Sequence, residues 1–218
     1  MIRTRVWLVV VMLACGGSAF AQDAVAPPPE RIGLFAADVR VSFPNFKGPA
    51  EIATALGVDE HNLPNHGFGL VFGAHFYPLH MGAVTLGLGA ELSRSRATRS
   101  QEPTSQGATP GPTTETKFSA LSPQVSLNFG GKNGWSYLSG GLGWGTLTTQ
   151  LEAKPLPDAN GSVSVLNYGG GARWFTTRHL AVSLDLRFYT VSAQEAAPGR
   201  PAYPKTRLIM ASAGIALK

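Results

Sequence analysis

The most constraining feature of this chain is the alternation of apolar and polar residues through its carboxyl-terminal half. From Leu180 to Phe188 every second residue is apolar, whereas the residues between them are Ala181, Ser183, Asp185 and Arg187. Side chains alternate between the two faces of a β-strand, so each such run has one apolar and one polar face. A soluble sandwich turns its apolar faces inward, whereas a membrane barrel turns them outward into lipid.

The amino terminus predicts export from the cytoplasm. Arg3 and Arg5 precede an apolar run over residues 6–14, which is too short to cross a bilayer as a helix. Ala19-Phe20-Ala21 then has the small-x-small pattern of a cleavage site. Residues 1–21 are therefore predicted to be a cleaved secretory signal peptide, with an uncleaved helix as the alternative.

Cysteine usage agrees with export. The only cysteine, Cys15, lies inside the predicted signal peptide, so the processed chain has no thiol for a disulfide or a metal site. Residues 12–15 resemble a weak lipoprotein signal, but cleavage after Ala21 fits the sequence better. No later apolar stretch has the length of a transmembrane helix. A membrane-spanning form must then be a closed barrel, because lipid satisfies no backbone hydrogen bonds.

The rest of the chain is predicted to form one domain. Residues 22–31 are a short, proline-rich lead-in in the periplasm, and residues 32–218 are the β-barrel. The alternation predicts eight strands, roughly at 33–43, 67–77, 82–95, 117–129, 135–149, 162–175, 180–193 and 206–217.

The links between these strands alternate between short and long. The short links are residues 78–81, 130–134 and 176–179, and the long links are residues 44–66, 96–116, 150–161 and 194–205. This alternation is typical of an up-and-down barrel with short periplasmic turns and longer external loops.

On this topology and alternation, residues 31–218 resemble the eight-stranded outer-membrane β-barrel family of the OmpA/OmpX type. The resemblance implies an all-β, eight-stranded antiparallel up-and-down transmembrane β-barrel in the bacterial outer membrane. It also implies insertion by the barrel-assembly machinery. Members usually end in an aromatic residue that this machinery reads, whereas this chain ends in Leu217-Lys218.

Charged residues on the polar faces indicate how the lumen is filled. Three acids and three arginines share this parity: Asp38, Arg40, Glu91, Arg173, Asp185 and Arg187. An eight-stranded barrel is just wide enough for side chains to fill, and an unpaired buried charge costs several kcal/mol. We therefore expect a salt-bridge network that plugs the lumen, with a conducting constriction as the alternative.

The apolar parity is predicted to face lipid. Five aromatic residues near the short turns, Phe76, Phe129, Trp135, Trp174 and Phe175, are expected to form an aromatic girdle at the periplasmic interface. The alternative is a soluble barrel in which these apolar residues point inward and form the core.

A cluster of arginines suggests a lipid partner. The formal net charge of the chain is +5, and Arg94, Arg96 and Arg99 follow one another at the end of the third predicted strand. At the outer leaflet these arginines would meet lipopolysaccharide phosphates; the alternative is that they only keep the loop soluble. No nucleic-acid partner is predicted, since the chain is exported and has no basic face with interleaved aromatic residues.

No motif points to catalysis, a cofactor or a metal. His75 and His179 are candidate bases, but no spacing places a nucleophile and an acid beside either of them. The His-x-Ser pattern of small lipid A acyltransferase barrels is absent, because Leu180 and Ala181 follow His179. Residues 59–61 with His66 have no known metal-ligand spacing.

The sequence therefore predicts a non-enzymatic, integral outer-membrane protein with a filled lumen. Its role would be structural, adhesive or ligand-recognising through its external loops. A narrow porin-like channel and a lipid A modifying enzyme are the alternatives. The sequence names neither a ligand nor an oligomeric state.

Overall fold

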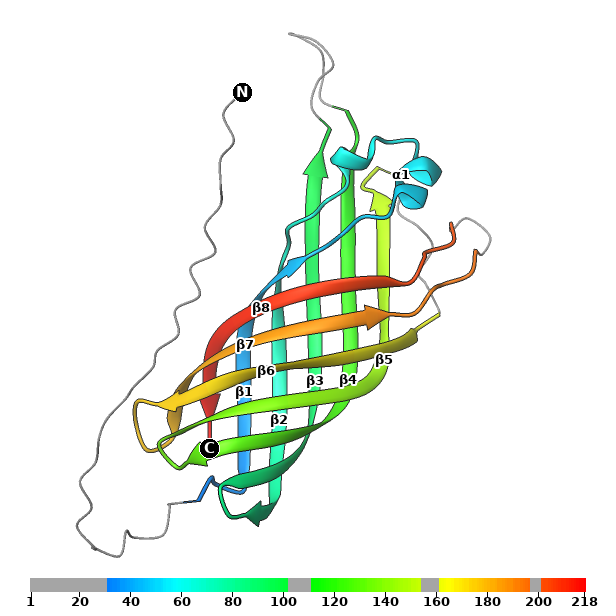
Figure 1. Cartoon of the computed structure of the whole chain (residues 1–218). Helices are drawn as coiled ribbons and strands as arrows, with labels where there is room; N and C mark the ends of the chain where they lie inside the picture. Colours follow the sequence, from blue (N-terminus) through cyan, green and yellow to red (C-terminus); the bar gives the residue numbers. More distant parts are fainter. Residues whose placement is uncertain (1–30, 102–110, 154–160, 197–200) are drawn as a thin grey trace, which may run out of the picture.

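The computed structural model describes residues 31–101, 111–153, 161–196 and 201–218, which form a closed barrel of eight strands (Figure 1). Every strand pairs antiparallel with the next one along the chain, and β8 pairs with β1. The strands are β1 Phe35–Asn45, β2 Phe68–Met81, β3 Val84–Ser100, β4 Thr113–Gly131, β5 Gly134–Leu151, β6 Val163–Phe175, β7 Leu180–Val191 and β8 Thr206–Leu217. The predicted fold class is confirmed, whereas the signal peptide 1–21 and lead-in residues 22–30 lie outside the described residues.

Short and long connections alternate as predicted, although several boundaries differ. Pairing of β2 with β3 continues through a register shift between Phe76 and Leu79, so the turn is at residues 82–83 and not at 78–81. Gly82 has φ 61°, a backbone conformation that glycine adopts without steric cost. β3 and β4 pair as far as Ser100 and Thr113, so residues 96–100 and 113–116 of the predicted loop 96–116 are strand.

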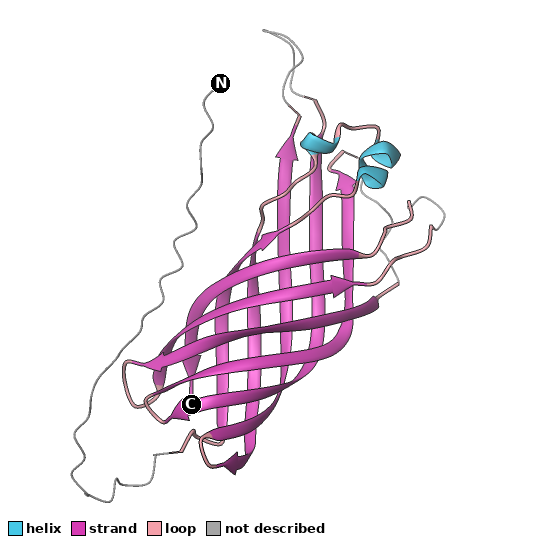
Figure 2. Ribbon diagram, in the orientation of Figure 1, coloured by secondary structure: helices cyan, strands magenta, loops and turns pink. Residues whose placement is uncertain are grey.

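The first long connection contains two short helices that the alternation did not predict. Helix α1 spans Ala50–Leu56 and a 3-10 helix, η1, spans Glu60–Asn62. α1 follows Pro49 and ends at Gly57, whose left-handed backbone (φ 66°) lets its N–H bond the last turn. Both helices lie at the barrel end that carries the long connections (Figure 2). No helix among the described residues is long and apolar enough to cross a membrane.

The outer wall of the barrel is apolar. Leu142 is 69 % exposed and Leu184 is 46 % exposed, and similar side chains cover the outward face of every strand. Monomeric soluble proteins rarely expose continuous apolar surface beyond a few hundred Å². A continuous apolar belt around a closed barrel instead faces lipid. The fold is therefore a transmembrane barrel, and the soluble alternative is wrong.

The interior has a polar middle between two apolar clusters. The cluster toward the long connections includes Phe46, Ile52, Val71, Phe118, Leu147, Leu208 and Met210. The cluster toward the short turns comprises Ile32, Ala36, Tyr77, Trp135 and Tyr137, with Phe175 packed against it. Charged side chains lie between the two clusters and form the candidate site described below.

The predicted aromatic girdle is only partly correct. Phe76, Phe129 and Trp174 are exposed on the outer wall, as expected. Trp135, however, is 2 % exposed and stacks on Phe175 inside the barrel, with ring centroids 5.1 Å apart. The reason is parity: counted back from the outward Leu138, residue 135 falls on the inward face of β5.

Candidate functional site

The six predicted lumen charges meet in the middle of the barrel. Asp38 and Arg40 come from β1, Glu91 from β3, Arg173 from β6, and Asp185 and Arg187 from β7. Each residue has the inward parity of its strand, and none is more than 5 % exposed. Four strands thus bring equal numbers of opposite charges into one buried layer.

Arg40 is the centre of this layer. Its Nε lies 2.7 Å from Asp38 Oδ1, its Nη2 2.6 Å from Glu91 Oε2 and its Nη1 3.0 Å from Asp185 Oδ1. A planar guanidinium presents donors in several fixed directions, which suits it to several carboxylates at once. One side chain from β1 therefore binds all three acids and connects β1, β3 and β7 across the lumen.

Arg187 shares two of these acids with Arg40. Its Nε lies 3.1 Å from Glu91 Oε2 and 3.0 Å from Asp185 Oδ1. Two of its donors also reach neutral partners: Nη1 donates to Gln124 Oε1 at 2.8 Å and Nη2 donates to Ser139 Oγ at 2.9 Å. The guanidinium is thus held from β3, β4, β5 and its own strand.

Arg173 binds the third acid from the side nearer the short turns. Its Nη2 lies 2.5 Å from Asp38 Oδ2, and its Nη1 donates to the Tyr77 hydroxyl at 3.1 Å. The guanidinium carbon lies 4.6 Å from the centre of the Tyr137 ring, a cation–π distance. His75 joins the same group, with Nε2 3.0 Å from Asp38 Oδ2.

Two tyrosines complete the network, and the sequence analysis did not assign them this role. The Tyr137 hydroxyl donates to Asp185 Oδ2 at 2.7 Å, and the Tyr189 hydroxyl donates to Glu91 Oε1 at 2.7 Å. Glycine supplies the space, since a Cβ on Gly171 would lie 2.7 Å from the Tyr137 hydroxyl. Both tyrosines have inward parity, which is the signal that would have identified them.

The barrel mouth beyond this layer is also filled. Ile52 of α1 is fully buried in the apolar cluster, and the Tyr203 hydroxyl lies 3.2 Å from Thr149 Oγ1. Burial raises the pKa of Tyr203 above its ordinary value, so the phenol remains a neutral hydrogen-bonding group. Helix α1 and Tyr203 thus cover the end opposite the short turns.

The rings of the two candidate bases bond an acid, an arginine and a backbone carbonyl. His75 contacts Asp38 and Arg173, whereas His179 Nδ1 lies 3.2 Å from the Lys218 carbonyl oxygen. Within the described part of the chain, no histidine ring bonds a serine or threonine hydroxyl. The same residues contain no group of three or more His, Cys, Asp or Glu side chains placed to hold a metal ion.

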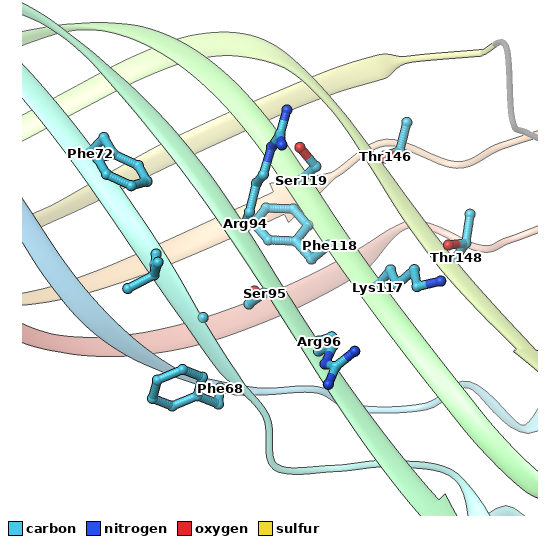
Figure 3. Close-up of a pocket in the computed structure, with 12 residues that line it drawn as sticks. Phe68, Phe72, Arg94, Ser95, Arg96, Lys117, Phe118, Ser119, Thr146 and Thr148 are labelled. Atoms are coloured by element: carbon cyan, nitrogen blue, oxygen red, sulfur yellow. The ribbon is translucent and has the colours of Figure 1, made fainter. Parts of the chain in front are cut away.

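The predicted arginine cluster is divided by strand parity. Arg94 and Arg96 are exposed on the outer wall, whereas Arg99 has the opposite parity and is only half-exposed. Lys117 of β4 is the register partner of Arg96, so Lys117 and not Arg99 is the third cation beside Arg94 and Arg96. These three cations line a groove of about 740 Å³ on the outer wall over β2 to β5 (Figure 3).

Comparison with known proteins identifies the fold. No family model matches the sequence. No curated protein matches it either. Among solved structures, Neisserial surface protein A is similar with a TM-score of 0.50 and 12 % identity, over 84 % of this chain and 96 % of that one.

Two further outer-membrane proteins show a weaker likeness. OprG from Pseudomonas aeruginosa has a TM-score of 0.44 and 10 % identity, over 87 % of this chain and 97 % of that one. The outer membrane protease OmpT from Escherichia coli has a TM-score of 0.41 and 8 % identity, over 84 % of this chain and 96 % of that one. At these identities the likeness concerns the fold alone. The chain has the fold of the eight-stranded outer-membrane β-barrels, which confirms the resemblance drawn from its sequence.

Proposed function

We propose that this protein is a non-enzymatic, integral outer-membrane barrel with a permanently filled lumen. One observation carries the proposal: Arg40 alone pairs with all three acids and closes the lumen between β1, β3 and β7. Opening a path for solutes would separate these pairs and leave buried charges without partners, which costs several kcal/mol. The closed layer favours this function over a porin-like channel.

A structural or recognition role then lies with the surfaces outside the lumen. The hairpin of β3 and β4 rises beyond the other strands, and α1 lies beside the end of β5 (Figure 1). The predicted signal peptide, residues 1–21, would direct export, and the assembly machinery would insert the barrel into the outer membrane. The β3–β4 hairpin and α1 would then face the outside of the cell. We propose that adhesion or ligand recognition uses them, in contact with outer-membrane lipid.

Solute flux through reconstituted vesicles tests the closed lumen. Vesicles containing lipid A and the wild-type protein should swell in isotonic arabinose no faster than empty vesicles, whereas vesicles with a general porin should swell quickly. Mass spectrometry of the recovered lipid A should show no change in acyl chains or phosphates. Swelling that increases with protein content would support the channel instead, and altered lipid A would support the enzyme.

A further inference from the structure

The outer wall changes from apolar to polar within one row of paired residues. On β3, β4 and β5 the last apolar row is Leu92, Leu121 and Trp144, and the next outward rows are Arg94, Ser119 and Thr146, then Arg96, Lys117 and Thr148. The apolar band of a membrane barrel matches the hydrocarbon of the bilayer. These two polar rows therefore lie where hydrocarbon gives way to lipid headgroups, on the side of the long connections.

Two of the three cations in these rows have no anionic partner in the part of the chain that the structure describes. Among the described residues, no carboxylate forms an ion pair with Arg94 or Arg96. Lys117 Nζ lies 2.9 Å from Glu115 Oε2, yet the Lys117 side chain remains 52 % exposed. At the edge of the bilayer this leaves an excess of positive charge directed outward.

An apolar wall flanks these cations on one side only. Along β2 the outward face stays apolar, so Leu70 lies beside Arg94 and Phe68 lies beside Arg96. Figure 3 shows the cations between Phe68 and Phe72 on one side and the threonines of β5 on the other. The groove thus combines an apolar strip, continuous with the lipid-facing belt, and a cationic strip at headgroup level.

We propose that this groove binds an anionic membrane lipid of the outer leaflet, of the phosphorylated lipid A class. Arg94 and Arg96 hold its phosphate, Lys117 adds a third cation, and an acyl chain runs along Phe68 and Phe72 toward the hydrocarbon. Guanidinium groups bind phosphate oxygens with two parallel hydrogen bonds, which suits them to this headgroup. The proposal rests on the proposed function, because it requires the barrel to sit in the outer membrane.

A membrane lipid fits the groove better than a soluble polyanion. A soluble chain of sulfates or phosphates would best meet cations on the tips of the external connections. Here the cations lie on the barrel wall, and the adjoining Phe68 and Phe72 offer nothing to a polar chain. An amphiphile, with one charged and one apolar end, matches both strips of the groove.

Native mass spectrometry of the purified barrel in detergent tests the proposal. The probes are bisphosphorylated lipid A, the same lipid without phosphates, and phosphatidylethanolamine. Wild type should bind the bisphosphorylated lipid about tenfold or more tightly than the Arg94→Ala/Arg96→Ala variant, since the variant loses the charged hydrogen bonds that two guanidinium groups donate to the phosphate. The matched control is Arg207→Ala, which removes an outward arginine from β8 and should leave the affinity within about twofold of wild type.

Several outcomes would overturn the proposal. The double variant, or Arg94→Gln/Arg96→Gln if that one folds poorly, would contradict it by retaining wild-type affinity while still migrating as a folded barrel. Equal binding of the dephosphorylated lipid would assign the contact to the apolar belt alone. Binding of heparin without lipid, with loss of lipid in competition, would assign the groove to a soluble polyanion. Failure of the proposed function would instead appear as solute flux or altered lipid A in the vesicle assay.

Discussion

Replacing Arg40 by alanine is expected to destabilise the barrel by about 3–5 kcal/mol, because removing one member of a buried ion-pair network leaves charge uncompensated. Without Arg40, Glu91 and Asp185 must share Arg187, while Asp38 retains only Arg173 and His75. Three acids then face two arginines in a layer from which solvent is excluded. Arg173→Ala should cost less than Arg40→Ala, since Arg173 pairs with one acid and Arg40 with three.

Urea unfolding in lipid vesicles, followed by tryptophan fluorescence, measures this loss. Arg207→Ala removes the same side chain from the outer wall and should change the free energy of unfolding by no more than about 0.5 kcal/mol. An Arg40→Ala cost below about 1 kcal/mol would mean that water replaces the guanidinium, and the layer would then not be a dry seal.

An arginine in place of Leu184 should cost about 2–4 kcal/mol, the penalty of a cation on the lipid face near the middle of the bilayer. Leu184 is exposed on β7 between Val182 and Leu186. Its neighbours on the adjoining strands are Ala172 and Ala213, which offer the charge no polar partner.

The matched control makes the same substitution at the edge of the belt. Leu217 is also exposed but lies at the end of β8 beside the short turns. There Leu217→Arg should cost only about 0–1 kcal/mol, because the side chain reaches headgroups and water. Equal costs at the two positions in vesicle unfolding would argue against a bilayer spanning this wall.

The strands and the inward set of charges were predictable because both depend on parity alone. Every second residue of a strand shares a face, so Asp38 and Arg40 could be assigned to the lumen without knowing their partners. The pairing itself was not predictable. That Arg40 reaches Glu91 and Asp185 depends on the stagger of strands around a closed barrel, which no local pattern records.

The remaining differences arise where the contrast between the two faces of a strand is weak. Beyond Leu92 the outward face of β3 carries arginine, threonine and serine, and the inward face carries serine, alanine and arginine, so the end of the strand gives no clear signal in the sequence. The same lack of contrast placed Arg99 with Arg94 and Arg96, although only even-numbered positions face outward there. Helix α1, of 7 residues, is too short for its periodicity to be seen within a loop.

The orientation of the barrel wall is the central claim, and tryptophan quenching by brominated lipid tests it most directly. Single-tryptophan variants, made by Trp→Phe changes, would be reconstituted in vesicles whose acyl chains carry bromine. Trp144 and Trp174 are exposed on the outer wall, whereas Trp135 lies inside the barrel. Fluorescence from Trp144 or Trp174 should be strongly quenched, and fluorescence from Trp135 should persist. Quenching of Trp135 with protection of Trp144 would contradict the account, because it would place the polar face of the strands in lipid.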